Sequence, residues 1–465
     1  MVSRMKVLWL CNIMLPLVAE HFHMEGSNKE GWLSGLVSVL LERKEENGIE
    51  LAVAFPVQSD LHRDGAFPWM DKEVFRAKIK GLTAYGFVED TVHPERYEEA
   101  LERKMRLITD DFAPDVVHCF GTEYPHTLAM CKAFPRKERL LIGIQGLCEV
   151  YANTYFANLP EKTVQAVTFR DFVKGDSIVK QQEKFARRGK MEVEAVQLAG
   201  NITGRTAWDK HYANKWNPKA HYYHMNETLR ANFYTGIWQE QETIPHSIFL
   251  SQGDYPIKGL HYMLLALPAI RRKYPDVKVY VAGNSIVNYT TWKDKLKISA
   301  YGRYLRRLIC QEQLQNHVVF LGKLNAGEMK DQYLKSSLFV CCSTIENSPN
   351  SLGEAMLLGM PCVSANVGGI SSIFLSGEDG ILYEGYRTPK NSFDNECNHK
   401  ITEESKLQNN VEALASAVLE MWEDSEQRKK YCKNARNHAL KNHDRETNYR
   451  RMTEIYAKII GESER

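Results

Sequence analysis

The sequence predicts an α/β protein with two domains, each built on a parallel sheet. The chain has 465 residues, which is longer than one ordinary domain. Short apolar runs alternate with amphipathic stretches along both halves, a pattern typical of parallel sheets with crossover helices. The composition, 43% hydrophobic and 25% charged residues, is that of a globular protein with a sizeable core.

In the first half, strands are predicted where short apolar runs have polar borders. These runs are residues 6–11, 50–55, 115–120, 140–145, 195–203 and 221–225. The amphipathic stretches between them include helices at 32–46 and 96–110. The apolar start of the chain could imitate a secretion signal, but Asn12 and Pro16 interrupt it. We therefore expect a buried first strand followed by a loop.

The second half repeats the alternation. Its predicted strands are residues 247–251, 278–282, 317–321, 337–342 and 361–365, and its helices include 260–273 and 327–336. The polar stretch 235–245 is the expected linker, and a charged helix is expected at 446–460. We expect a first domain at 1–240, a second at 241–440, and a C-terminal helix within 441–465 that packs back on the first domain.

Charge and cysteine usage narrow the functional classes. The formal net charge of +2 gives no electrostatic basis for nucleic-acid binding. None of the ten cysteines forms a C-x-x-C pair, which favours reduced thiols and a cytoplasmic location. No apolar segment reaches the roughly 18 residues of a membrane span. Basic stretches at 76–80, 103–106 and 184–190 could contact an anionic membrane surface, or they could be solvated helix faces.

Glu346 and Glu354 stand on either side of a predicted strand-to-helix turn. The helix is expected to start near Asn350 and Ser351, with Glu354 in its first turn. Open α/β sheets bind ligands at the carboxyl ends of their strands, and backbone N–H groups at a helix start attract anions such as a diphosphate. We expect a ligand with phosphate and sugar hydroxyls here, although acids at a helix start also occur for structural reasons alone.

Other strand ends of the second half carry residues suited to such a ligand. Lys258, in a Lys-Gly pair after the strand at 247–251, could meet a phosphate or could be a surface residue. Asn284 ends the next strand and Lys323 follows the third. Because the carboxyl ends of parallel strands share one edge, these side chains are expected to converge.

A longer pattern surrounds the glutamate pair. From Glu346 the chain reads E-x7-E, then A-M-x-x-G-x-P-x-V, and then a glycine pair at Gly368 and Gly369. This pattern resembles the donor-binding motif of family 4 retaining glycosyltransferases, and Lys258 with Gly259 is similar to that family's phosphate-binding lysine. The resemblance covers essentially the whole chain. It implies the GT-B fold, in which two Rossmann-like domains have parallel sheets facing across a cleft.

The resemblance also implies roles. Glu346 would face the donor sugar, Glu354 would bind the ribose hydroxyls, and Lys258 would stabilise the leaving diphosphate. His126 is counted with Glu346 and Lys258 as catalytic. The donor-side candidates besides Glu354 are Gln252, Gly253, Asn284, Lys323, Asn350, Ser351, Leu352, Gly353 and Arg205.

The chain departs from the family pattern at several positions. An arginine is common five or six residues before the lysine, where Gly253 and Gln252 stand here. Arg205 is a candidate replacement, unless it is structural. Phe120 and Gln145 replace frequent histidines of the first domain.

The acceptor side is expected in the first domain. Its candidates are His118, Glu123 and Asn12, although His118 lies in a predicted strand and would fit a core histidine equally well. His126 is expected on a loop. Segments beginning at His118, Gly204 and Asn226 resemble a branch that builds bacterial capsular polysaccharides and exopolysaccharides.

The expected reaction moves a hexose from a UDP- or GDP-sugar to a glycan or lipid-linked glycan. No D-x-D motif is present, so no metal and no cofactor are expected. The predicted enzyme is cytoplasmic, in part at the inner face of the membrane. Three alternatives stay open: a nucleotide-sugar epimerase, a glycoside phosphorylase, and a non-catalytic sugar-binding subunit.

Overall fold

The chain folds into two compact units. The computed structural model describes residues 4–24, 31–43, 46, 48–58, 67–287, 291, 296–385 and 403–463. The first unit comprises Met1–Val150, Phe185–Arg230 and His443–Arg465, and the second comprises Tyr151–Lys184 and Ala231–Asn442. The units therefore differ from the expected ranges: residues 151–184 fall in the second unit rather than in a domain spanning 1–240.

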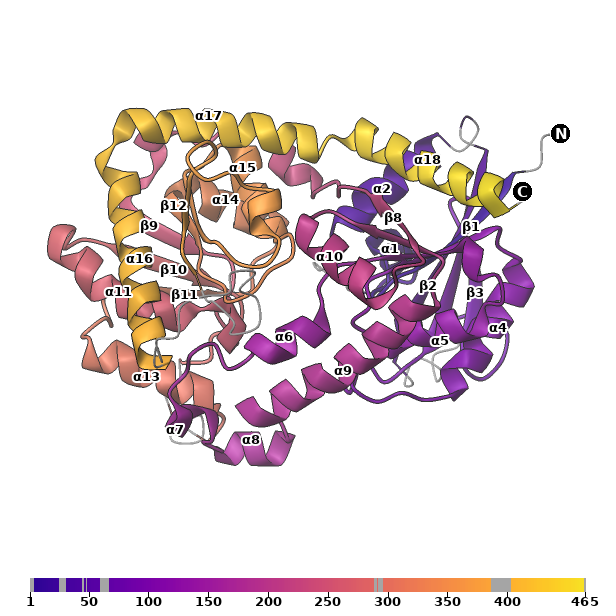
Figure 1. The fold of residues 1–465 in the computed structure, drawn as a ribbon, viewed down its shortest axis with the longest axis horizontal. Coiled ribbons are helices and arrows are strands. Elements are labelled where there is room, and N and C mark those ends of the chain that lie inside the picture. The colour runs from indigo at the N-terminus through magenta and orange to yellow at the C-terminus, as the bar shows by residue number, and fades with distance from the viewer. Residues whose placement is uncertain are drawn as a thin grey trace. The chain divides into compact units, whose positions relative to one another are not determined.

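The first unit is built on an eight-stranded sheet with the order β3-β4-β2-β1-β5-β6-β7-β8 (Figure 1). Neighbouring strands are parallel except β3 and β4, which pair antiparallel. The strands are β1 (Met5–Leu10), β2 (Ile49–Val57), β3 (Val74–Ile79), β4 (Leu82–Val88), β5 (Val116–Phe120), β6 (Leu140–Gly143), β7 (Asn201–Gly204) and β8 (His221–His224).

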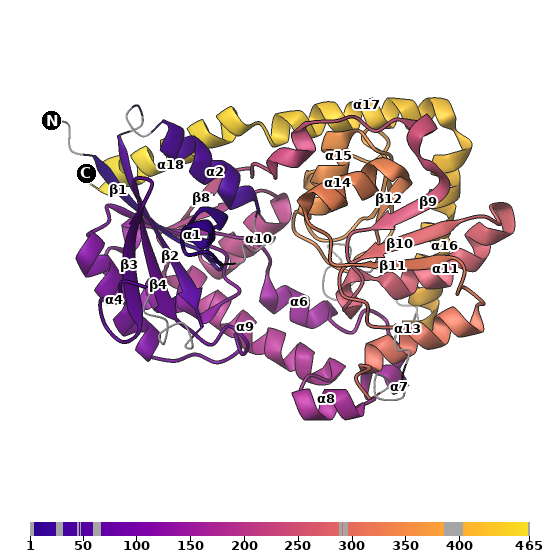
Figure 2. The same cartoon turned by 180° about the vertical axis from the view of Figure 1, so that it is seen from behind.

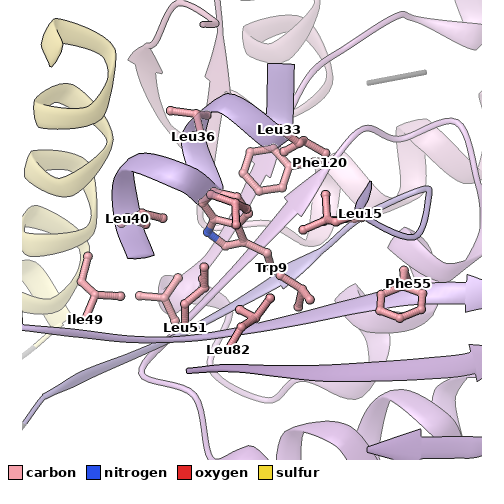
Figure 3. Packing of buried hydrophobic residues seen from close by; sticks show 14 of the residues in the cluster. Trp9, Leu15, Leu33, Leu36, Leu40, Ile49, Leu51, Phe55, Leu82 and Phe120 are labelled. Carbon is pink, nitrogen blue, oxygen red and sulfur yellow. The ribbon is translucent and has the colours of Figure 1, made fainter. Parts of the chain in front are cut away.

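Helices cover both faces of this sheet because successive side chains of a buried strand point to opposite sides. Val7 and Trp9 of β1 belong to the core on one face, which includes residues of α2 and α18 (Figure 3). Leu8 of β1 belongs to the other core, with residues of α4 and α5. The helices of this unit are α1 (Pro16–His21), α2 (Gly31–Glu42), α4 (Ala100–Phe112), α5 (Pro125–Ala133), α10 (Ala207–Trp216) and α18 (Arg445–Ser463).

The second unit has a six-stranded sheet of order β11-β10-β9-β12-β13-β14, parallel throughout (Figure 2). Its strands are β9 (Ile244–Leu250), β10 (Lys278–Ala282), β11 (Val318–Gly322), β12 (Ser336–Cys341), β13 (Cys362–Ala365) and β14 (Ile381–Tyr383). Its helices are α7 (Glu161–Val164), α8 (Phe169–Lys174), α11 (Leu260–Lys273), α13 (Ala300–Gln311), α14 (Ala326–Lys335), α15 (Asn350–Leu358), α16 (Glu403–Glu423) and α17 (Ser425–Asn442).

Two further helices, α6 (Cys148–Thr154) and α9 (Ile178–Leu198), each begin in one unit and end in the other. The expected strand at 195–203 is wrong, because α9 continues to Leu198 and β7 starts only at Asn201. The apolar residues Ala195 and Val196 are buried as part of the helix. The polar linker expected at 235–245 ends inside β9.

No helix among the residues that the structure describes is both long enough and apolar enough to cross a membrane.

Candidate functional site

The strand order of the second unit reverses between β9 and β12. From β9 the chain adds β10 and β11 on one side, and it then returns to place β12 on the other side. Such a switch point opens a crevice at the carboxyl ends of the two strands, where α/β sheets bind ligands. Lys258 follows β9 and Glu346 follows β12, so both expected catalytic residues of this unit lie at the switch point.

The loop after β9 is fixed closely against the loop after β12. Gly259 adopts a left-handed φ of 73°, and a Cβ there would lie 1.9 Å from the carbonyl oxygen of Cys342. The Thr344 N–H donates to the carbonyl oxygen of Ile257 at 2.8 Å. The glycine after Lys258 is therefore required by the close approach of the two backbones, which sets the lysine beside Glu346.

Lys258 and Glu346 form a largely buried ion pair. The lysine Nζ lies 2.6 Å from Glu346 Oε1, and the Ser343 hydroxyl donates to the same oxygen at 2.7 Å. Burial alone would lower the pKa of Lys258, but the negative charge of Glu346 and the hydrogen bond between them hold it well above its usual value. Burial also raises the pKa of the neighbouring Tyr255.

Gly368 and Gly369, in the loop after β13, contact the backbone of Glu346. A Cβ on Gly368 would lie 2.0 Å from the Glu346 carbonyl oxygen, and Gly368 has a φ of 57°. The Gly369 N–H donates to that carbonyl at 2.9 Å. Three loops, after β9, β12 and β13, thus determine the position of Glu346, and the two glycine signals of the sequence have a steric explanation.

Helix α15 starts directly after this loop. It begins at Asn350, as expected, with Pro349 at the N-cap and no side-chain cap. Glu354 is its fifth residue, which places it just beyond the first turn rather than within it. Its side chain is buried. Ser351, Leu352 and Gly353 form the first turn, whose N–H groups give a helix start its partial positive charge.

The remaining donor-side candidates of this unit follow β9, β10 and β11. Gly253 has no room for a side chain, because a Cβ there would lie 2.8 Å from Leu260 and 2.9 Å from Val281. The Asn284 amide donates to Asp254 at 3.0 Å. Gln252 follows β9 and is half-buried, and Lys323 follows β11, two strands away in the sheet, and is exposed. An arginine five residues before Lys258 would therefore require the side chains of Leu260 and Val281 to shift.

The first unit has a switch point of its own, between β1 and β5. Asn12 follows β1 and His126 follows β5, and Asn12 Oδ1 lies 3.1 Å from His126 Nε2. The other ring nitrogen lies 2.7 Å from Glu89 Oε2, which follows β4. His126 is fully buried as the second residue of α5, so its expected place on a loop is wrong. The sequence did not point to Glu89, because its partner His126 is distant in the chain.

Glu123 lies beside this group. Its Oε1 accepts from the Gly146 N–H at 3.0 Å, and its carbonyl accepts from Arg188 Nε at 2.8 Å. A nearby acid, Glu192 of α9, is fully buried and accepts from Thr122 at 2.5 Å. Burial raises the pKa of Glu192 to about 8. The first unit thus brings Asn12, Glu123 and His126 together, and it adds two carboxyl groups that the sequence did not single out.

His118 is a core residue rather than a member of this group. It is fully buried in β5, where its Nδ1 lies 2.7 Å from the hydroxyl of Tyr456 in α18. Burial lowers its pKa to about 3, so the ring is neutral. The expectation that His118 lies on the acceptor side is therefore corrected.

Arg205 is also corrected. It lies in the first unit, buried after β7, where its guanidinium pairs with Glu227 and hydrogen-bonds Gln145 Oε1 at 3.2 Å. Its charge is already neutralised by Glu227, which makes it a poor replacement for the arginine missing near Lys258.

No cluster of three or more His, Cys, Asp or Glu side chains suited to a metal ion occurs within the described ranges. The charged residues in the described loops after β9 and β12 include Asp254, Lys258 and Glu346, with Glu354 in the helix that follows.

Comparison with known proteins agrees with this geometry. Residues 237–394, which include β9 to β14 and α15, match the family model described as glycosyl transferases group 1. The matched residues all lie in the second unit. The match includes both strand ends at the switch point of the second unit, so the Lys258 and Glu346 loops lie within the matched residues.

Curated relatives match the chain in part. Spore coat protein SA of Bacillus subtilis is 27% identical over 135 residues, which are 29% of this chain and 34% of that protein. The putative glycosyltransferase YtcC of the same organism is 24% identical over 184 residues, which are 39% of this chain and 38% of the relative. The chain thus spans little more than a third of the length of these relatives.

Solved structures match nearly the whole chain. HepE of Anabaena superposes with a TM-score of 0.62 at 14% identity, over 98% of this chain and 100% of that one. Sucrose-phosphate synthase of Thermosynechococcus elongatus gives a TM-score of 0.61 at 14% identity with the same coverage. With two parallel-sheet α/β units and these neighbours, the chain has the GT-B fold.

Proposed function

We propose that this chain is a retaining glycosyltransferase that moves a hexose from a UDP- or GDP-sugar to a glycan or lipid-linked glycan, in the synthesis of a surface polysaccharide. The observation that carries the proposal is the Lys258–Glu346 pair at the switch point of a group 1 glycosyltransferase domain. The neighbouring structure HepE was crystallised with UDP-glucose, and with UDP and glucose, which supports a nucleotide-sugar donor.

In this proposal Lys258 stabilises the leaving diphosphate. A lysine ammonium has three donors, so Lys258 can keep its 2.6 Å contact with Glu346 and still donate to a phosphate oxygen. Glu346, fixed by three loops, positions the donor sugar and responds to positive charge that develops on it. The retaining outcome is part of the proposal and follows from the resemblance of the E-x7-E pattern.

Glu354 holds the nucleotide by accepting hydrogen bonds from the ribose hydroxyls. The first turn of α15, from Asn350 to Gly353, gives the helix start a partial positive charge that would attract the diphosphate, while its Leu352 and Gly353 N–H groups already donate to the Pro349 carbonyl. Gln252, Gly253, Asn284 and Lys323 line the neighbouring strand ends on the donor side. We propose that these four residues contact the donor, as the sequence suggested.

The reaction is proposed to need no metal and no cofactor. The negative charge of the leaving group is instead compensated by Lys258, whose pKa is held high, and by the helix start. Since Gln252 and Gly253 stand where an arginine is common, Lys258 carries more of this task than a lysine assisted by a second cation would. Activity should therefore survive EDTA.

The acceptor is proposed to meet the first unit near Asn12, Glu123 and His126. A cytoplasmic location at the inner face of the membrane would suit a lipid-linked acceptor. The basic stretches expected to contact the membrane are weak support for this, because Arg76 pairs with Asp111, Arg103 with Asp71 and Glu73, and Arg106 with Glu102.

The test is nucleotide release from a panel of UDP- and GDP-sugars with a lipid-linked glycan acceptor, followed by NMR assignment of the product anomer. Glu346→Gln should abolish transfer and leave nucleotide affinity unchanged. Glu354→Ala should weaken nucleotide binding about 10- to 100-fold, because a hydrogen bond to a charged acceptor contributes about 1.5–3 kcal/mol. Glu378→Ala, an exposed acid of the same unit, is the matched control.

Nucleotide binding without turnover on any donor and acceptor pair would replace the proposal by a non-catalytic binding role. Inversion of the anomer would refute the retaining mechanism, and loss of activity in EDTA that magnesium restores would refute metal independence.

A further inference from the structure

The short helix α8 of the second unit presents apolar side chains to solvent. Val167, Phe169, Phe172 and Val173 are between 58% and 78% exposed. Both views place α8 at the periphery of its unit, beside α7 and near α13 (Figures 1 and 2). Exposed aliphatic residues scattered singly are ordinary, but four large apolar side chains within seven consecutive positions form a patch that marks an interaction site.

The outward direction of these side chains is fixed by the opposite face of the helix. At about 100° per residue, Phe169, Phe172 and Val173 fall within about 100° of one another, and Asp171 falls on the far side. Asp171 is buried, and its Oδ2 accepts from the Ala300 N–H at the start of α13 at 2.9 Å. The helix therefore turns its carboxylate toward the protein and its apolar face toward solvent, the reverse of an ordinary surface helix.

Specific polar contacts fix the position of α8, which argues against an accidental exposure of its apolar side chains. Thr168 and Asp171 form a capping box at its start, and Gly175 ends it in the left-handed conformation. Arg170 pairs with both Asp171 and Asp176 and so neutralises their charge next to the buried carboxylate. These polar contacts hold the backbone without using any of the apolar side chains, which leaves that face available for a partner.

The size of the patch decides between a protein partner and a lipid surface. Aromatic side chains bury about 150–250 Å² each, so this face offers roughly 500 Å². A stable protein interface needs about 800 Å² from each partner. Two projecting phenylalanines on a short helix instead match the shallow insertion by which amphipathic segments enter the boundary between headgroups and acyl chains.

Exposed lysines on α7 and α8 also favour a lipid surface with anionic headgroups. Lys162 on α7 and Lys174 at the end of α8 are exposed, with Glu161 as an acidic neighbour. Lysine side chains beside an apolar face can lay their methylene stems along the lipid and reach headgroup phosphates with their ammonium groups.

We propose that α8, with Val167, is a membrane-docking element that inserts Phe169, Phe172 and Val173 into a bilayer surface bearing anionic headgroups. The docking does not require the chain to be an enzyme. Its benefit to catalysis, delivery of a lipid-linked acceptor, rests on the proposed function.

The test is co-sedimentation of the full chain with vesicles of phosphatidylglycerol and phosphatidylcholine, compared with phosphatidylcholine alone. Phe169→Ser/Phe172→Ser should lower the partition coefficient by about tenfold or more, since each substitution removes an aromatic ring that would insert into the lipid. Lys162→Glu/Lys174→Glu should weaken binding to anionic vesicles and remove its salt dependence. The matched control Val92→Ser/Ile237→Ser, at positions 69% and 59% exposed, should bind like wild type.

Circular dichroism and melting temperature should be unchanged in every variant, and nucleotide release with a water-soluble acceptor should be unaffected by the serine pair. This separates the docking proposal from the proposed function. Equal binding of wild type and the Phe169/Phe172 variant overturns the proposal. So does sedimentation of wild type as a dimer that the same variant converts to a monomer, because a second copy of the chain would then cover α8.

Discussion

Lys258, which follows β9, and Glu346, which follows β12, form an ion pair in a largely buried position. Lys258 is 21% exposed and Glu346 is 9% exposed, measured on their side chains, and Ser343 supplies the only other contact described for Glu346 Oε1. In such a place the negative charge of Glu346 keeps the pKa of Lys258 well above its usual value, although burial alone would lower it. We therefore expect an energetic coupling between Lys258 and Glu346, which can be measured without reference to any reaction.

Removing both partners should cost less than the sum of the two single removals. Lys258→Met leaves the Glu346 carboxylate with the Ser343 hydroxyl alone, and Glu346→Gln leaves a buried ammonium opposite an amide. The double variant Lys258→Met/Glu346→Gln should be more stable than the sum of the two single losses predicts. The coupling free energy should be about 0.5–3 kcal/mol, measured by urea unfolding of the four chains. Additive losses would show that the 2.6 Å contact contributes no coupling.

At the scale of elements, glycines decide how closely the loops after β9 and β12 approach each other. Gly259 and Gly377 have similar positive φ values, 73° and 77°. A Cβ on Gly259 would collide with the Cys342 carbonyl, whereas a Cβ on Gly377 meets nothing within 4 Å. The two positions therefore separate backbone strain from collision with a neighbouring loop.

Gly377→Ala should cost about 1 kcal/mol of unfolding free energy from the left-handed conformation alone. Gly259→Ala should cost clearly more, and it should also weaken nucleotide binding, because the loop that carries Lys258 must move. Urea unfolding and nucleotide titration measure the two effects. If both alanine variants lost the same stability, the close approach of the β9 and β12 loops would not be a constraint on the fold.

The packing of α9 against α6 predicts a pH effect. Glu192 has its pKa raised to about 8 by burial, against hydrogen bonds from Thr122 and the Glu149 N–H that lower it. A carboxyl whose pKa is higher in the folded chain than in the unfolded chain binds its proton more tightly when folded. Its contribution to stability is therefore greatest below about pH 4.5 and is lost as the pH rises to about 8.

Glu192→Gln should remove this dependence. Urea unfolding at pH 5, 6.5 and 8 should show wild type losing stability relative to the variant across the series. Glu194→Gln changes an exposed acid on the same helix and should follow wild type. Parallel curves for wild type and Glu192→Gln would mean that the carboxyl is already ionised in the folded chain at pH 5.

The elements also show what a sequence can and cannot predict. Strand β10 and helix α11 have the expected bounds, because their apolar periodicity is local. The edge strand β3 was missed because Arg76 and Lys78 interrupt its apolar pattern with exposed charges, as edge strands require. The candidate donor-side residues Glu346 and Glu354 come from one contiguous motif, whereas Glu89 and Glu192 become visible only when the fold brings distant segments together.

At the scale of the whole molecule, the fold class was predictable because two series of β-α units determine it. The division into units was not, because α6 and α9 carry residues 151–184 into the second unit and back. Each unit has its own sheet and its own switch point. This duplication predicts that the two switch points respond to different ligands.

Hydrogen exchange should separate the two responses. UDP alone should protect backbone amides at residues 251–259 and 343–354, the loops of the second unit that bear Lys258, Glu346 and Glu354. Amides at residues 12–15 and 121–126 in the first unit should be protected only when an acceptor glycan is added, because their polar groups belong to another sheet. Glu354→Ala should remove the UDP-dependent protection and leave the acceptor-dependent protection intact. Protection of the first-unit segments by UDP alone, as strong as in the second unit, would contradict a division of labour between the two switch points.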